Sequence, residues 1–364
     1  MMELLSKYVE FKNGKKRPDS KGSIPVYGGN GILDYTDVAN MQSGIVIGRV
    51  GVYCGNVFLV RDKCWVSDNA IKAICHENID LGYLYYLLSS LHLNERRIGT
   101  SQPLLTQKIL NNIEVDVPGL TTQKKIASLL GLFDSKIKLN NEINENLEQQ
   151  AQAYFQNLFI DNANSEWVQG TISDLGTVVG GSTPSKSKPE YYTKDGIAWI
   201  TPKDLSINKA KFISHGENDI TELGLKNSSA SVMPEGTVLF SSRAPIGYIA
   251  ITSGKVTTNQ GFKSVVPKPE IGTAFVYYFL KYNLPIIEGM ASGSTFKEVS
   301  GSTMKNISAV IPDTKTLGFF RDFCAPIFAQ QKILEEQNQS LSTLRDSLLP
   351  KLMSGEINVS DVRF

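Results

Sequence analysis

Residues 120–159 read LTTQKKIASLLGLFDSKIKLNNEINENLEQQAQAYFQNLF, a stretch with no proline and a single glycine, Gly131. Apolar and amide side chains recur along it at alternating intervals of four and three residues. The members of this series are Ile126, Leu130, Phe133, Ile137, Asn140, Asn144, Leu147, Ala151, Tyr154 and Leu158. A heptad repeat of this kind predicts a long helix whose apolar seam packs against a second helix.

The same seam returns 194 positions later, between Phe320 and Leu352. Its members are Phe320, Cys324, Ile327, Gln331, Leu334, Asn338, Leu341, Arg345, Leu348 and Leu352. A helix that pairs with its own repeat is the economical assembly, so we expect the chain to carry both halves of one coiled coil. Because proline lacks an N–H group and clashes with the preceding turn, the second helix is expected to begin at Pro326 or to bend there. Its counterpart Leu132 follows Gly131, which indicates an interruption of both helices at the same height.

Four amide side chains occupy the predicted seam, namely Asn140, Asn144, Gln331 and Asn338. A buried amide lowers stability unless it finds a hydrogen-bond partner. Polar seam residues are known to fix the register and orientation of coiled coils, so we predict this role for the four. The alternative is that the two helices splay at this height and water reaches the amides.

The chain is also duplicated outside the helices. Asp68–Ile74 matches Asn259–Val265, and Tyr83–Leu88 matches Phe275–Leu280. Both copies consist of short β-branched and aromatic runs punctuated by Gly, Pro, Asn and Asp, a pattern typical of strands and turns. A helix is expected over 82–91 and over 273–281.

These patterns predict an α+β fold in which two mixed β-rich domains are separated by two long helices that form a coiled coil. The internal duplication implies pseudo-twofold symmetry. We expect a first domain at residues 1–117, a central helical spacer at 118–161, a second domain at 162–311 and a C-terminal helical spacer at 312–364.

Composition excludes several classes of protein. The 364 residues include 37 Lys and Arg against 36 Asp and Glu, so bulk charge predicts no partner. No apolar run approaches the roughly 18 residues of a spanning helix, and the first ten residues lack a signal-like core, so we expect a cytoplasmic protein. Four cysteines without a C-x-x-C pair indicate buried thiols, with neither a disulfide framework nor a metal site.

Motifs of catalysis are missing from the sequence. It has no G-x-x-x-x-G-K-[ST] phosphate loop, no H-E-x-x-H, no G-x-S-x-G and no Asn-Pro-Pro-Tyr type tetrapeptide of amino-methyltransferases. The three histidines, His76, His92 and His215, are neither clustered nor duplicated. The sequence therefore argues against a stand-alone nuclease or methyltransferase.

Cationic loops recur in both copies. Lys15, Lys16 and Arg17 crowd one turn-rich stretch, and Lys186 and Lys188 lie in the corresponding loop of the second copy. Several cations in one loop suit the positioning of nucleic-acid phosphates. A solvated surface with no partner is the competing interpretation.

Matched residues elsewhere in the two copies could contact bases. Arg49 and Arg243 each follow an apolar strand, where a guanidinium could reach a base edge or pair with a core carboxylate. Loops of small hydroxyl and amide side chains also correspond, and cations flank them. The loop residues are Thr100, Ser101, Gln102, Ser294 and Thr295, and the flanking cations are Arg96, Arg97 and Lys297.

Three segments resemble the specificity (S) subunits of type I restriction-modification systems. They are Trp167–Val168 with the following Gly180–Pro184, Gln123–Ala127 at the start of the central helix, and the closing Arg345–Ile357. With the duplication, the resemblance covers nearly the whole chain. Thr122 departs from the Glu that the family commonly has before Gln123, and the second copy lacks this helix-opening motif at Leu317–Phe319.

The resemblance implies two target recognition domains held apart by two antiparallel helices. Each domain would read one half of a split sequence in double-stranded DNA. Two methyltransferase (modification) subunits would dock on the chain, flip out the target adenines and supply S-adenosylmethionine. A separate motor-nuclease subunit would complete the restriction enzyme. The chain itself would be non-catalytic and would need no cofactor or metal. The alternative is a non-enzymatic scaffold that presents two protein-binding domains at a fixed spacing.

The duplication predicts that each domain determines its own half of the DNA target independently of the other domain. Replacing residues 1–117 with the equivalent domain of a relative should change one half of the methylated DNA motif and leave the other half as it is. Sequencing of methylated adenines would measure this. A change in both halves would contradict the modular interpretation.

Overall fold

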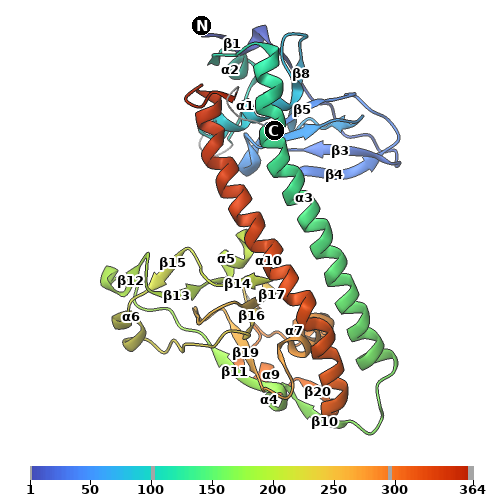
Figure 1. The fold of residues 1–364 in the computed structure, drawn as a ribbon, viewed down its shortest axis with the longest axis vertical. Helices are drawn as coiled ribbons and strands as arrows, with labels where there is room; N and C mark the ends of the chain where they lie inside the picture. The colour runs from blue at the N-terminus through green and yellow to red at the C-terminus, as the bar shows by residue number, and fades with distance from the viewer. Residues whose placement is uncertain (1, 100–102, 294–296, 360–364) are drawn as a thin grey trace. The chain divides into compact units, whose positions relative to one another are not determined.

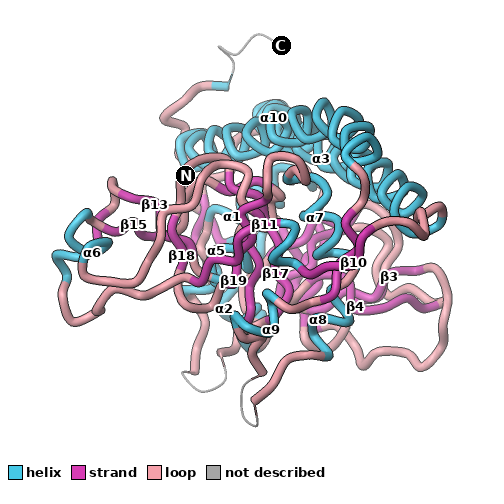
Figure 2. Tube along the Cα trace, turned by 90° about the horizontal axis from the view of Figure 1, so that it is seen from below, coloured by secondary structure: helices cyan, strands magenta, loops and turns pink. Residues whose placement is uncertain are grey.

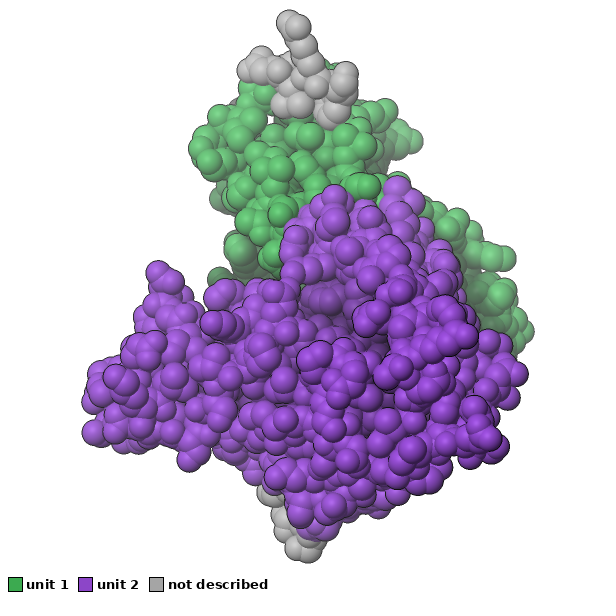
Figure 3. Space-filling view, turned by 60° about the horizontal axis from the view of Figure 1, so that its bottom comes forward, with its two compact units in different colours: residues 1–138, 338–364 green, residues 139–337 purple. Residues whose placement is uncertain are grey.

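A computed structural model describes residues 2–99, 103–293 and 297–359 of the chain. Its contacts divide the chain into two compact units, shown in Figure 3. The first unit comprises Met1–Lys138 and Asn338–Phe364, and the second comprises Leu139–Gln337. Each unit therefore holds one β-rich domain together with part of both long helices.

The first unit is built on a four-stranded antiparallel sheet with strand order β2–β8–β5–β6, of which β5 and β8 are labelled in Figure 1. A three-stranded sheet, β4–β3–β7, and a two-stranded sheet, β1–β9, accompany it. The strands are β1 (Glu3–Leu4), β2 (Val9–Asn13), β3 (Ile24–Gly28), β4 (Gly31–Thr36), β5 (Gly44–Gly48), β6 (Val57–Val60), β7 (Trp65–Val66), β8 (Ala70–Cys75) and β9 (Glu114–Val115). The short helices are α1 (Leu81–Ser90) and α2 (Gln107–Asn111).

The second unit has a five-stranded sheet with order β11–β19–β16–β17–β14, a four-stranded sheet β12–β15–β13–β18 and a two-stranded sheet β10–β20. The strands are β10 (Val168–Thr171), β11 (Gly176–Gly180), β12 (Tyr192–Thr193), β13 (Ile197–Ile200), β14 (Phe212–Ile213), β15 (Asn218–Ile220), β16 (Val238–Ser242), β17 (Ile246–Thr252), β18 (Thr257–Thr258), β19 (Lys263–Pro267) and β20 (Ser308–Ile311). The short helices are α4 (Ile172–Leu175), α5 (Pro202–Ile207), α6 (Glu222–Lys226), α7 (Thr273–Tyr282), α8 (Leu284–Gly289) and α9 (Gly301–Lys305).

The strand connections repeat between the two units. The antiparallel order β2–β8–β5–β6 reappears as β11–β19–β16–β17, and the sheet β1–β9 reappears as β10–β20. β3 runs parallel to β7, as β13 runs parallel to β18. Helices α1 and α7 lie where the sequence predicted them. The prediction of an α+β fold with two mixed β-rich domains is confirmed.

The central strand of each unit is buried on both faces. Along β5, Ile45 and Ile47 belong to the same apolar cluster as Tyr83 of α1, whereas Val46 points to the opposite face and packs with Val66 of β7. Successive side chains of a strand alternate between faces, so one strand serves two cores. The corresponding residues of β16 are Val238 and Phe240 on one face and Leu239 on the other.

Two long helices, α3 (Leu120–Gln156) and α10 (Thr314–Met353), run side by side in Figures 1 and 2. α10 begins at Thr314 and continues through Pro326, so the expectation that it begins at Pro326 is wrong, and α3 likewise continues through Gly131. Pro326 is exposed, while its neighbours Cys324 and Ile327 are buried in an apolar cluster. Burial of these neighbours offsets the hydrogen bond that the proline loses.

The predicted seam residues lie inside the cores of the two units. In the first unit, Ile126 and Leu130 of α3 share an apolar cluster with Leu352 of α10. In the second unit, Tyr154 of α3 contacts Phe320 of α10 with ring centroids 6.0 Å apart. Contacts between early residues of α3 and late residues of α10 make the helices antiparallel. Among the described residues, no helix combines the length and hydrophobicity that crossing a membrane requires.

The seam amides are arranged as hydrogen-bonding groups between the helices. Asn140 is fully buried, and its Nδ2 donates to Oε1 of Gln337 at 3.4 Å. Gln331 is buried too, and its Nε2 donates to the main-chain oxygen of Asn144 at 3.2 Å. Asn338 is half-buried. The role of these amides in fixing the register stays a prediction.

Adjacent phenylalanines of α10 allow a matched test of this packing. Phe320 is 1% exposed and Phe319 is 55% exposed. Phe320→Ala should lower the free energy of unfolding by about 3–5 kcal/mol, because it leaves a cavity among aromatic rings. Phe319→Ala should change it by less than about 0.5 kcal/mol. Urea unfolding of both variants measures the difference, and equal effects would contradict the assigned helix face.

Candidate nucleic-acid interface

The candidate residues of the first unit meet at one end of its four-stranded sheet. Lys15 follows β2 and forms a β-bridge with Ser67, in the turn that leads into β8. Arg49 is the first residue after β5, and its main-chain N donates to the oxygen of Asn69 in the same turn at 3.0 Å. Nη1 of Arg49 donates to the main-chain oxygen of Asp68 at 3.3 Å. The structure thus brings Lys15 and Arg49 to opposite sides of the turn 67–69.

A hairpin-like loop is tied to the same place. Ile98 and Leu104 exchange main-chain hydrogen bonds of 2.9 Å, and Leu105 N donates to the oxygen of Arg49 at 2.9 Å. Thr100, Ser101 and Gln102 belong to this loop but lie outside the described residues. Arg96 and Arg97, just before the loop, are exposed.

Positive charge is concentrated beside Lys15. Lys15, Lys16 and Arg17 are exposed, and Arg17 forms an ion pair with Asp34. Lys72 of β8 is buried, and its Nζ donates to the main-chain oxygen of Asn40 at 3.1 Å. Burial lowers the pKa of Lys72, and the nearby Lys15 lowers it further.

Lys72 was not among the residues predicted from the sequence. The available signal was that Lys72 is the one charged residue in the run Ala70–Cys75. A cation at an otherwise apolar strand position is a stronger indication than a cation in a loop.

The second unit repeats the tied loop, but its arginine is displaced by one residue, because Ser242 makes the main-chain hydrogen bonds that Arg49 makes in the first unit. Arg243 is the first residue after β16, and its Nη1 lies 3.3 Å from Oε2 of Glu298. Ser292 and Glu298 exchange main-chain hydrogen bonds of 2.9 and 3.1 Å, and Val299 N donates to the oxygen of Ser242 at 3.0 Å. Lys297 is exposed, whereas Ser294 and Thr295 lie outside the described residues.

Lys186 and Lys188 lie in an exposed loop after β11. Nζ of Lys188 is 5.4 Å from the ring centre of Tyr191. The loop starts at the sheet end that also holds Gln260, because Thr183 forms a hydrogen bond with that side chain. Both predicted cationic loops thus leave the equivalent strands, β2 and β11.

Two glycines fix where these loops start. A Cβ atom on Gly14 would lie 1.9 Å from the main-chain oxygen of Ser67, and one on Gly181 would lie 2.0 Å from that of Asn259. Real side chains do not tolerate such distances, so only glycine lets the chain pass the turn before β8 or β19. This close approach explains why both copies carry glycine here.

A buried cation joins the second unit to its helices. Nζ of Lys211 donates to Oε2 of Glu148 at 2.8 Å and to Oε1 of Gln331 at 2.9 Å. The same nitrogen lies 3.1 Å from the hydroxyl of Tyr278. Glu148 also accepts a hydrogen bond from Nζ of Lys281 at 2.6 Å. The Glu148 carboxylate of α3 therefore contacts side chains of α7, of α10 and of the segment before β14.

Glu335 of α10 holds the same segment from the other side. Its two carboxylate oxygens accept hydrogen bonds from the main-chain N–H groups of Lys211 and Phe212, at 2.7 and 3.0 Å. The segment belongs to an addition of the second unit, since β14 has no counterpart in the first. In the first unit, fewer side chains link α1 to the two long helices. Tyr86 of α1 donates a hydrogen bond to Asp134 of α3, and Asp134 also forms an ion pair with Arg345 of α10.

The pKa values follow from this burial. Burial lowers the pKa of Lys211 to about 8, although Glu148 opposes the change. Burial alone would raise the pKa of Glu148, but Lys211 and Lys281 outweigh it and bring the value to about 2. The pair is therefore charged at neutral pH.

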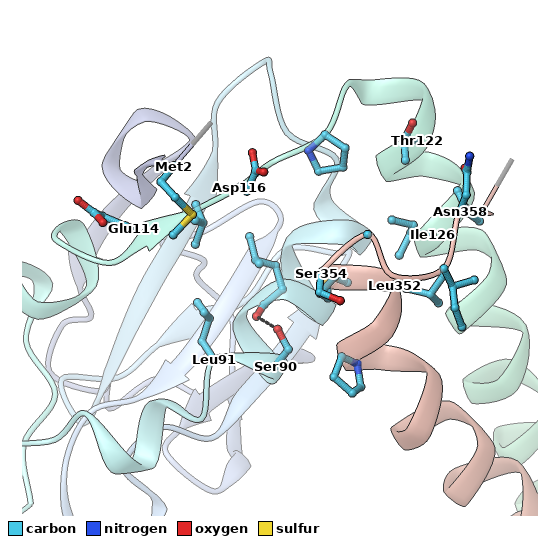
Figure 4. Close-up of a pocket in the computed structure, with 18 residues that line it drawn as sticks. Met2, Ser90, Leu91, Glu114, Asp116, Thr122, Ile126, Leu352, Ser354 and Asn358 are labelled. Carbon is cyan, nitrogen blue, oxygen red and sulfur yellow. Dashed lines mark hydrogen bonds between the residues drawn. The ribbon is translucent and has the colours of Figure 1, made fainter.

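The first unit contains a cavity of about 680 Å³. Figure 4 shows Thr122 and Ile126 from the start of α3 and Leu352 and Ser354 from the end of α10 around it. These residues belong to, or directly adjoin, the two helix-terminal segments Gln123–Ala127 and Arg345–Ile357. The fold thus brings together two motifs that are far apart in the sequence.

Groups with catalytic potential are few in the described part of the chain. It holds no cluster of three His, Cys, Asp or Glu side chains arranged to bind a metal ion. The cysteines are free thiols. Burial raises the pKa of Cys64 to about 11 and that of Cys324 to about 12, so these two thiols are protonated at neutral pH.

The chain matches a known protein family twice. Residues 7–149 and again residues 164–345 match the family described as "Type I restriction modification DNA specificity domain". The two matches correspond to the two copies of the duplication.

Individual relatives carry the same description. The chain is 40% identical over 180 residues to the type I restriction enzyme MjaIX specificity subunit of Methanocaldococcus jannaschii, a match that covers 47% of this chain and 41% of that protein. It is 26% identical over 338 residues to the HindI specificity subunit of Haemophilus influenzae, covering 72% and 73% of the two chains. The crystal structure of a type I S subunit from M. genitalium has the same fold, with a TM-score of 0.63 at 18% identity over 97% of this chain and 96% of that one.

The charged pair predicts an acid sensitivity. The folded-state pKa of Glu148 lies below the unfolded value of about 4.5, so the stabilisation that it contributes is present above pH 4.5 and is lost as pH falls towards 2. Between pH 4.5 and 3, the free energy of unfolding should therefore fall less steeply for Glu148→Gln than for the parent. The difference between the two slopes should be up to about 1.4 kcal/mol per pH unit. Glu145→Gln, an exposed change on the same helix, is the control. Urea unfolding at each pH measures the slopes, and identical slopes for parent and Glu148→Gln would contradict the prediction.

Proposed function

Because the chain belongs to the specificity subunits of type I restriction-modification systems, we propose that it is the subunit that reads a bipartite sequence in double-stranded DNA. Each unit would read one half of the sequence. The observation that carries this proposal is an arrangement present in both units: a loop tied to the end of the central strand, an arginine at that end, and a cationic loop that passes the same turn.

The exposed cations and the half-buried arginines suit different contacts. Lys15, Lys16, Lys186 and Lys188 are exposed on loops, which favours phosphate contacts that carry no sequence information. Arg49 and Arg243 are held at strand ends, by a main-chain oxygen and a carboxylate respectively. A restrained guanidinium suits a base edge, because its planar fork matches the two acceptors of guanine.

Partner subunits would supply what the chain lacks. The net charge of +1 is small for a protein that must neutralise a DNA backbone, so partners would contribute part of the phosphate clamp. We propose that two methyltransferase subunits bind S-adenosylmethionine and modify the adenines, and that a motor-nuclease subunit cleaves. The chain itself would be non-catalytic and without a cofactor. The cavity between the two helix-terminal motifs is our candidate for a partner contact.

The function is tested by expressing the chain with the methyltransferase subunit of its own system and mapping methylated adenines in the host DNA. A split motif with two fixed halves is expected. Methylation that depends on the methyltransferase but ignores this chain would overturn the proposal.

Single cations should differ in the way they affect binding. In the complex with methyltransferase subunits, Lys16→Ala should weaken binding to all sequences and reduce the slope of log affinity against log salt by about one. Lys7→Ala, at the other end of β2, is the control and should keep the parent slope. Arg17→Ala should have a smaller effect than Lys16→Ala, because Asp34 already neutralises this cation. Fluorescence anisotropy over a salt series measures the slopes. A protein-binding scaffold would show no such dependence.

A further inference from the structure

One carboxylate lies between two cations beside the tied loop of the second unit. In the second unit, Glu298 lies between two cations, with Oε2 3.3 Å from Nη1 of Arg243 and Oε1 3.2 Å from Nζ of Lys263. Glu298 is attached through its main chain to Ser292 at the base of the tied loop. Its side chain is about one-third exposed, so the triad lies at the surface.

The first unit has no acid at the matching position. The paired residues Ile98 and Leu104 correspond to Ser292 and Glu298, 194 positions later. Leu104 therefore stands where the second unit has Glu298. Arg49 bonds to a main-chain oxygen, and Ile71 holds the strand position of Lys263, because Ile71 pairs with Asn13 as Lys263 pairs with Gly180.

The carboxylate changes both the charge and the freedom of Arg243. An arginine side chain carries roughly 2 kcal/mol of rotamer entropy, which binding must overcome unless the side chain is already held. Glu298 holds Arg243 through Nη1, the one hydrogen bond that the guanidinium makes within the described ranges 2–99, 103–293 and 297–359. The remaining N–H donors stay available for a base edge. The same carboxylate reduces the net charge of the triad to +1, which weakens attraction to phosphate.

We propose that Glu298 is a positioning residue that orients Arg243 toward a guanine in the half-site read by the second unit. The proposal rests on the DNA-reading function proposed above. Glu298 weakens the attraction of this site to phosphate, but it fixes the plane of the Arg243 guanidinium. A bidentate contact to O6 and N7 of guanine requires such a fixed plane. Arg49, without a carboxylate partner, is expected to discriminate less strongly.

The test compares Glu298→Ala, Glu298→Gln and Glu288→Ala in the complex with methyltransferase subunits, using a DNA library randomised in both half-sites. Glu298→Ala should lower the preference for guanine at one position of the second half-site about five- to tenfold, a part of what a bidentate contact contributes. The first half-site should be unaffected. Glu298→Gln keeps an acceptor for Arg243 and should fall between the parent and Glu298→Ala. Glu288→Ala, which removes an exposed carboxylate of α8 in the same unit, should keep the parent preference.

A double-mutant cycle shows whether Glu298 acts through Arg243. In an Arg243→Ala background, Glu298→Ala should cause no further loss of preference. A uniform gain in affinity for all sequences with a steeper salt dependence would show that Glu298 only repels phosphate, and would overturn the inference. An unchanged preference in a folded Glu298→Ala variant would overturn it too. If the parent complex itself selects no sequence, the proposed function fails, which is a separate result.

Discussion

The burial of one helical seam inside the globular cores is the constraint on which the structure depends. Ile126 of α3 and Leu352 of α10 share an apolar cluster with the first sheet, and Phe155 and Phe320 do the same in the second unit. Each fully buried side chain of this size contributes roughly 1.5–3 kcal/mol. The helices are thus parts of both cores, and neither β-rich domain would bury its apolar face without them.

Features set by local periodicity were predictable from the sequence. The spacing of Ile126, Leu130 and the following seam residues depends only on the helical repeat, so it predicted α3 and its buried face. The duplication predicted the shared strand order, because equivalent sequences fold in equivalent ways. It also led to Arg49 and Arg243, which both follow the central strand. Their role in binding is still a prediction.

Features set by long-range contact were not predictable. The heptad pattern does not indicate that Glu148 forms an ion pair with Lys211, which is 63 residues away in the sequence. Pro326 was expected to begin or bend the second helix, but burial of its neighbours lets α10 continue through it. Glu298 was not predicted as a site residue. Its significance is that Leu104 stands at the equivalent position of the first unit. This equivalence follows from the main-chain hydrogen bonds that pair the ends of each loop.

The double burial of β5 and β16 has a consequence for how such a protein evolves. Their side chains serve a core on each face, so almost any substitution within these strands lowers stability. The residues just beyond the strands, such as Arg49 and Arg243, belong to neither core. Mutations can therefore accumulate at the strand ends while the scaffold stays under purifying selection, and a lineage can acquire a new target sequence without first acquiring a new fold.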